Sequence, residues 1–108
     1  MSDFKISRES GDKKFEIIVD IDFDKNGEPF IQEYSNGDQW SNNLSDIRIC
    51  NYYCDDESQE EWDNFLNDFL YLLESNELLT KIAKLKNKED SYFFNEENIE
   101  IKQIEEEL

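Results

Sequence analysis

Carboxylates are the side chains of this sequence that are best placed to do chemistry. The 108 residues include 28 Asp and Glu, 11 Lys and Arg and no His, which gives a formal charge of −17. Acid–base catalysis needs a carboxyl whose pKa is brought near neutrality by burial or by a close like charge, whereas exposed acids stay ionised. Without His, the commonest general base and zinc ligand is missing. The three Gly form no phosphate-binding motif. We therefore expect a protein that is not an enzyme and that uses no cofactor or metal.

One stretch nevertheless matches a metal-binding pattern in full. The sequence DFDKNGEPFIQE, residues 22–33, fits the loop D-x-[DN]-x-[DN]-G-x5-E that wraps calcium. Such a loop lies between two helices, whereas the residues before this one alternate as a strand does. The Asn26-Gly27 pair also favours a hairpin turn. We predict a hairpin with solvated acids, and a calcium-binding module stays as an alternative.

The two cysteines and the absence of targeting segments indicate the compartment. Cys50 and Cys54 form neither a four-ligand zinc set nor a C-x-x-C redox motif. We interpret them as thiols of a reducing cytosol, with a local disulfide as the alternative. No secretory signal and no apolar run of membrane-spanning length occurs. The prediction is a cytoplasmic protein that contacts neither membranes nor, given its charge, nucleic acid directly.

Alternating apolar residues predict an antiparallel sheet in the first half. Odd positions of residues 15–23 are all apolar and most even positions are acidic, which is the period of a half-buried strand. A turn at residues 10–12 should pair residues 3–8 with 14–23. A type I′ turn at Asn-Gly then leads to a third strand, with Pro29 at its start or on an edge. Ile47 and Ile49 suggest a fourth strand.

The second half predicts helices. The capping box of Ser58 and Glu61 should begin a helix, whose apolar stripe comprises Trp62, Phe65, Leu66, Phe69, Leu70 and Leu73. Trp62, Phe65 and Phe69 are expected in the core. Ser75-Asn76 should separate a shorter second helix. Residues 92–94 are expected to form a strand or an anchor on the core, and residues 99–108 an amphipathic helix or a frayed end.

These patterns predict a single acidic α+β domain over residues 1–108. An antiparallel sheet of three to five strands is packed by one long amphipathic helix and a shorter second helix. Strands dominate residues 1–54, helices occupy 58–87, and a strand or helix tail forms 88–108.

The negative charge is concentrated in the helical half. Residues 1–50 hold 11 acids and 6 bases, net −5, and residues 51–108 hold 17 acids and 5 bases, net −12. A turn of 100° per residue places acids opposite the apolar stripe, around Tyr71. Such a face is either simply solvated or a contact surface, since an aromatic anchor with a charged rim is typical of tight interfaces. The predicted partner-binding residues are Asp55, Asp56, Glu57, Glu60, Asp63, Asn64, Asp68 and Tyr71, with a secondary acidic patch of Asp20, Asp22 and Asp24.

A basic partner is therefore expected, and nucleic-acid enzymes are the obvious class because their grooves must be positive. In size, charge and α+β layering the chain resembles immunity proteins that neutralise nuclease toxins, and phage-type DNA mimics that inhibit restriction or CRISPR nucleases. The resemblance implies an acidic inhibitor that binds and blocks such an enzyme. The alternative is a generic acidic interaction or adaptor domain with a non-nuclease partner. The sequence predicts no oligomeric state.

Overall fold

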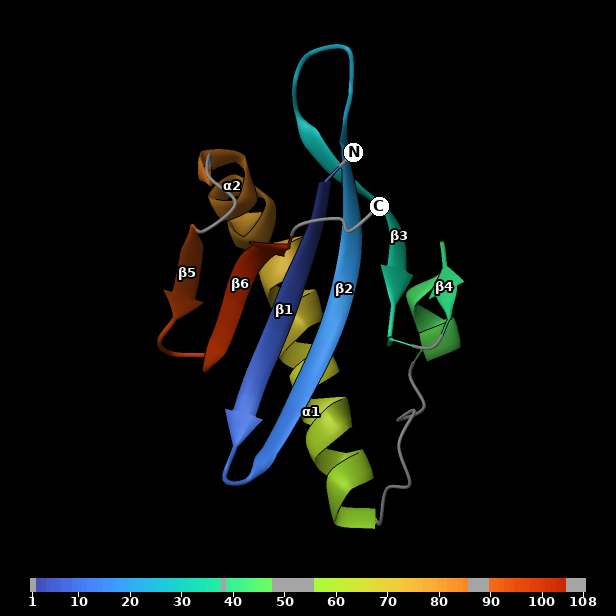
Figure 1. The fold of residues 1–108 in the computed structure, drawn as a ribbon, viewed down its shortest axis with the longest axis vertical. Coiled ribbons are helices and arrows are strands. Elements are labelled where there is room, and N and C mark those ends of the chain that lie inside the picture. Colours follow the sequence, from blue (N-terminus) through green and yellow to red (C-terminus); the bar gives the residue numbers. More distant parts are fainter. Residues whose placement is uncertain (1, 38, 48–55, 86–89, 105–108) are drawn as a thin grey trace.

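Six antiparallel strands form one layer, and two helices lie against one face of that sheet (Figure 1). The computed structural model describes residues 2–37, 39–47, 56–85 and 90–104. The α+β class is confirmed, but the sheet has six strands rather than three to five, in the order β4-β3-β2-β1-β6-β5. The elements are β1 (Ser2–Ser10), β2 (Lys13–Phe23), β3 (Pro29–Ser35), β4 (Trp40–Ser41), η1 (Leu44–Ile47), α1 (Asp56–Glu74), α2 (Glu77–Lys84), β5 (Ser91–Phe94) and β6 (Ile99–Ile104).

The first hairpin follows the predicted pairing. β1 and β2 are antiparallel, with Ile6 opposite Ile17 and Phe4 opposite Val19. These four side chains are buried against the helices. The alternate residues of both strands form the opposite face of the sheet, which no described helix covers (Figure 1).

The turn between β2 and β3 is not the predicted type I′ turn. Gly27 has a φ of 81°, but Asn26, which is also described, does not share the positive φ that type I′ requires. The Gly27 N–H donates to the carbonyl of Asp24 at 2.9 Å. The Asp24 carboxylate accepts from the backbone N–H groups of Asn26 and Glu28, at 2.8 and 3.0 Å. Because the aspartate organises the turn, Asn26 does not have to adopt a left-handed conformation.

β3 begins at Pro29, as predicted, and contains a bulge. Asp20 pairs with Glu33 while Ile21 pairs with Ile31, so Gln32 is an extra residue in β3. A regular strand cannot place both Ile31 and Tyr34 on one face, because side chains alternate with a period of two. The bulge resolves this conflict, since both side chains pack against the core.

The fourth strand lies earlier than predicted. β4 is Trp40–Ser41, paired with β3, whereas Ile47 belongs to η1 and Ile49 lies outside the described residues. Polar side chains explain the difference, because the Ser41 hydroxyl donates to Asp46 at 2.6 Å and accepts from the N–H of Asn43 at 3.0 Å. These bonds close residues 41–46 into a turn that leads into η1, where Ile47 suggests a strand.

α1 begins at Asp56, two residues before Ser58, so Ser58 lies inside the first turn and is not the predicted cap. The expected core side chains Trp62, Phe65 and Phe69 are buried. Asn76, with a φ of 65°, separates α1 from α2, as predicted. Neither described helix is long and apolar enough to cross a bilayer.

The prediction for the C-terminal segment is half right. Residues 91–94 form β5, but residues 99–104 form strand β6, not a helix or a frayed end, and residues 105–108 of that prediction lie outside the described residues. β6 lies between β1 and β5 in the sheet. Ile99 and Ile101 are buried on the helix side of the sheet. Their spacing of two residues is that of a strand, and the segment adopts it. The spacing of Ile101 and Ile104 suggests a helix, but in the sheet the backbone of β6 pairs with both β1 and β5.

Candidate protein-binding surfaces

The outward side of α1 presents one continuous line of exposed residues, which we call the helix line. Its members follow each other at intervals of three or four positions, so they lie on one face of the helix. Tyr71 is 57% exposed. The line comprises Glu57, Glu60, Asn64, Asn67, Tyr71 and Glu74. Four of the predicted contact residues, Glu57, Glu60, Asn64 and Tyr71, therefore lie together.

The other predicted acids of α1 do not lie on this line. Asp63 is partly buried and accepts a hydrogen bond from the Gln59 amide at 3.1 Å. Asp68 is partly buried and pairs with Arg8. Asp56 is the first residue of α1, and Asp55 lies outside the described residues. The negative charge of α1 is thus exposed mainly near the two ends of the helix line.

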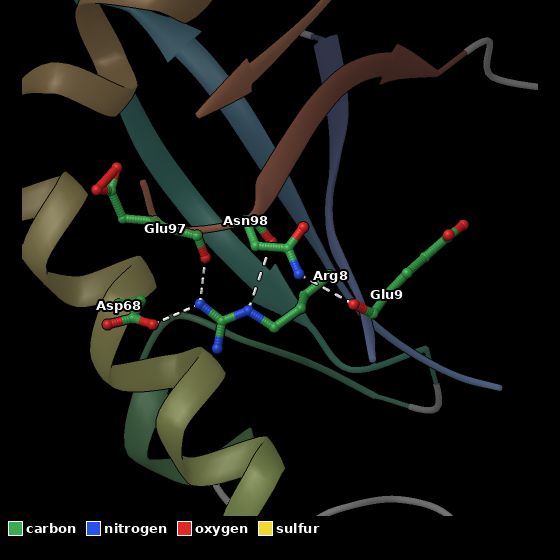
Figure 2. A network of polar contacts seen from close by, with 5 residues as sticks. All are labelled: Arg8, Glu9, Asp68, Glu97 and Asn98. Atoms are coloured by element: carbon green, nitrogen blue, oxygen red, sulfur yellow. Dashed lines mark hydrogen bonds and ion pairs between the residues drawn. The ribbon is translucent and has the colours of Figure 1, made fainter. Parts of the chain in front are cut away.

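Arg8 is a structural residue that the sequence analysis misses. It occupies a core-facing position of β1, and its guanidinium donates to the Asp68 carboxylate and to the carbonyls of Glu97 and Asn98 (Figure 2). It also lies 5.7 Å from the ring centre of Phe65. One cation therefore joins β1, α1 and the β5–β6 turn. Its signal in the sequence is a charge at a position where the alternation of β1 requires a buried side chain.

A second surface lies on the uncovered face of the sheet. Asp3 of β1 is opposite Asp20 of β2, and Asp20 is opposite Glu33 of β3. Directly opposed residues on neighbouring strands have Cβ atoms about 4.5–5.5 Å apart, so three carboxylates form a row. With Trp40 they line a shallow hollow. Trp40 is 47% exposed and Phe30 is 42% exposed.

We call this surface the sheet patch, and it corrects the predicted secondary patch. Asp20 and Asp22 occupy alternate positions of β2 and share the uncovered face, whereas the Asp24 carboxylate is bound to its own turn. The sheet patch comprises Asp3, Asp20, Asp22, Phe30, Glu33 and Trp40. The predicted pairing of the first two strands points to Asp3, but only the bulge brings Glu33 opposite Asp20.

The Asp20 carboxylate is incompletely hydrogen-bonded. Its Oδ1 atom is buried and has no hydrogen-bond partner in the described part of the chain. Elsewhere on the same face the charges are mixed, since Lys5 and Lys14 lie 3.9 and 3.4 Å from Glu16. Opposed like charges destabilise a sheet. The acidic row is therefore a local cost to the fold, in contrast to the mixed region beside it.

The calcium-loop pattern of residues 22–33 does not form a helix-bounded loop. β2 enters it and β3 leaves it, and Asp24 accepts hydrogen bonds from its own turn. Among residues 2–37, 39–47, 56–85 and 90–104, no group of three or more acidic or sulfur ligands is arranged to hold a metal ion. Comparisons of this chain with protein-family models, with curated proteins and with solved structures found no match.

Proposed function

We propose that this chain is a cytoplasmic acidic inhibitor that binds and blocks a nucleic-acid-acting enzyme. It would act as an immunity protein for a nuclease toxin or as a DNA-mimic anti-CRISPR or anti-restriction protein. The observation that supports the proposal is the helix line, where three carboxylates, two amides and Tyr71 face solvent with no cation among them. A groove that holds phosphates is positively charged, so it is complementary to such a surface.

The helix line offers an anchor as well as charge. An exposed tyrosine provides apolar area and a hydroxyl at little entropic cost, and interface hot spots are enriched in this residue. The carboxylates of Glu57, Glu60 and Glu74 accelerate the approach of a basic partner. Once bound, they occupy the positions of phosphates and exclude the nucleic acid. Affinity should therefore fall as salt rises.

Capture of the partner tests this function. The full chain, immobilised and exposed to lysate of its native host, should retain a basic nucleic-acid enzyme, identified by mass spectrometry. Added chain should inhibit that enzyme's activity on its nucleic acid. Recovery of only acidic or membrane proteins would contradict the proposal. A specific partner without nucleic-acid activity would favour the adaptor alternative.

Two variants then test the surface against the captured enzyme. Tyr71→Ala removes the anchor, and Asp63→Lys reverses a charge beside the helix line. Each should weaken binding by at least about 1–2 kcal/mol. Glu100→Lys is the matched charge control, because Glu100 is exposed on β6 and occupies the uncovered face of the sheet. Unchanged affinity in both α1 variants would move the interface away from α1.

A further inference from the structure

The uncovered face of the sheet has the composition of a protein contact site. No described helix covers it (Figure 1), and Trp40 and Phe30 expose large apolar surfaces there. Exposed aromatic side chains beside carboxylates are the elements from which interface anchors and rims are built. This surface lies on the opposite side of the sheet from α1, so it is separate from the helix line.

The acidic row favours a ligand of positive charge. Asp3, Asp20 and Glu33 stand side by side on three adjacent strands, although like charges at opposed positions destabilise a sheet. Leaving a polar atom such as Asp20 Oδ1 buried and unbonded has a further cost. A donor that carries positive charge would offset the repulsion at the accessible surface of the row, while the buried Oδ1 atom itself stays out of its reach. The surface therefore favours a cationic ligand.

The indole beside the row distinguishes between cations. A guanidinium is planar, stacks on an aromatic ring and donates two parallel hydrogen bonds to carboxylates, whereas an ammonium is a compact, strongly hydrated charge. Trp40 lines the same hollow as the three carboxylates. That combination suits a side chain whose flat face lies on the indole while its edge meets the acids.

We propose that the sheet patch binds an arginine side chain from a basic segment of a protein partner. The guanidinium stacks on Trp40 and pairs with the carboxylates of Asp20 and Glu33. Phe30 and Asp22 extend the surface along the same face of the β2–β3 hairpin and contact neighbouring residues of the segment. A second copy of this chain is not the expected occupant, because two bodies of charge −17 repel each other.

A short peptide tests the proposal without knowledge of the enzyme, so its result is independent of the proposed function. Octa-arginine amide is titrated into the ¹⁵N-labelled full chain at about 0.15 M salt, where long-range attraction is screened. The Trp40 indole N–H and the backbone amides of Asp20 and Glu33 should shift most. The indole N–H of Trp62, which is buried in the core, is the internal reference. Octa-lysine amide, of equal charge, should bind several-fold more weakly.

Variants separate the site from net charge. Asp20→Asn with Glu33→Gln should weaken octa-arginine binding on the order of 10-fold. Asp12→Asn with Glu96→Gln removes the same charge from two exposed turn residues and should change affinity by less than about 2-fold. Trp40→Leu leaves every charge in place and should weaken binding several-fold. Circular dichroism establishes that each variant is folded.

Four outcomes would overturn the proposal. The first is equal weakening by the two charge-removing pairs, which would mean that only net charge matters. The second is equal affinity for the two peptides, which would remove the role of the guanidinium. The third is a set of shifts centred on α1 with Trp40 unaffected. Dimerisation of the free chain through the sheet patch, seen by analytical ultracentrifugation, would also contradict it.

Discussion

Arg8 of β1 and Asp68 of α1, 60 positions apart in the chain, form an ion pair that joins the sheet to the helix (Figure 2). The Arg8 side chain is only 13% exposed, whereas that of Asp68 is 45% exposed. The two partners therefore depend on the bond to different degrees. Water can replace arginine around the Asp68 carboxylate and the exposed Asn98 carbonyl, whereas the Glu97 carbonyl that Arg8 also binds is partly buried.

Removal of Arg8 should therefore cost more stability than removal of its partner's charge. Arg8→Met is expected to lower the free energy of unfolding by about 2–3 kcal/mol, because it removes a charged donor that joins β1 to α1 and to the β5–β6 turn. Asp68→Asn should cost about 1 kcal/mol, since the amide oxygen still accepts. Urea unfolding measures both. Lys5→Met breaks an exposed pair with a 3.9 Å separation and should cost less than about 0.5 kcal/mol. Equal losses of unfolding free energy in Arg8→Met and Lys5→Met would contradict the structural role of Arg8.

The turn after β2 should depend on Asp24 rather than on calcium. Asp24→Ala removes the acceptor for two backbone N–H groups and should lower stability by about 1 kcal/mol. Calcium at millimolar concentration should not change the melting temperature, and its titration into the protein should release no heat of binding. A calcium-dependent rise in melting temperature that Glu33→Gln abolishes would revive the calcium-binding interpretation.

The strands of the first half are predictable because burial alone repeats every second residue there. Ile17, Val19 and their neighbours alternate with polar residues, and no helical spacing competes. In β6 the two patterns coexist, since Ile99 and Ile101 fit a strand while Ile101 and Ile104 fit a helix. Only the pairing with β1 decides between them, and that contact joins the two ends of the sequence.

The candidate surfaces also contain a part that local periodicity predicts and a part that depends on contacts between distant segments. The helix line follows from the 3.6-residue period, which places Glu60 and Tyr71 on one face without knowledge of the sheet. The neutralisation of Asp68 does not follow, because Arg8 comes from a distant strand. Likewise, Glu33 enters the sheet patch only through the bulge at Gln32, and a bulge shifts the register without a distinctive local pattern.

Deletion of Gln32 should be tolerated. Without it, Ile31, Glu33 and Tyr34 alternate as in a regular strand, so the same side chains keep the same faces. We expect a loss of less than about 1 kcal/mol and an unchanged circular dichroism spectrum. Deletion of Ile18, from an unbulged part of β2, shifts one end of that strand to the wrong face and should cost on the order of 3 kcal/mol or prevent folding. Similar losses in both variants would contradict the bulge.

Alkaline pH should destabilise the fold through Tyr34. Burial raises the pKa of its hydroxyl above the usual value of 10.0, so the folded state holds this proton more tightly than the unfolded state. The resulting stability is complete below the unfolded pKa and is lost as pH rises through the folded pKa. Tyr34→Phe keeps the edge-on contact with Phe69, 6.2 Å between ring centres, and abolishes the titration. Above about pH 10, the free energy of unfolding should therefore fall more steeply for the wild type than for the variant. Parallel curves up to pH 11 would contradict it.

The acidic row of the sheet patch should lower the stability of the fold and strengthen the binding of arginine. Asp20→Asn removes the central charge between Asp3 and Glu33 and should raise the free energy of unfolding by about 0.5–1 kcal/mol. The same variant should bind octa-arginine amide more weakly. Asp22→Asn is the matched control, because Asp22 is opposite Phe30 of β3 rather than another acid, and it should change stability by less than about 0.3 kcal/mol. A carboxylate needed only for folding would give the opposite sign, with Asp20→Asn less stable than the wild type. Greater stability together with weaker binding is the pattern expected of a residue kept for recognition.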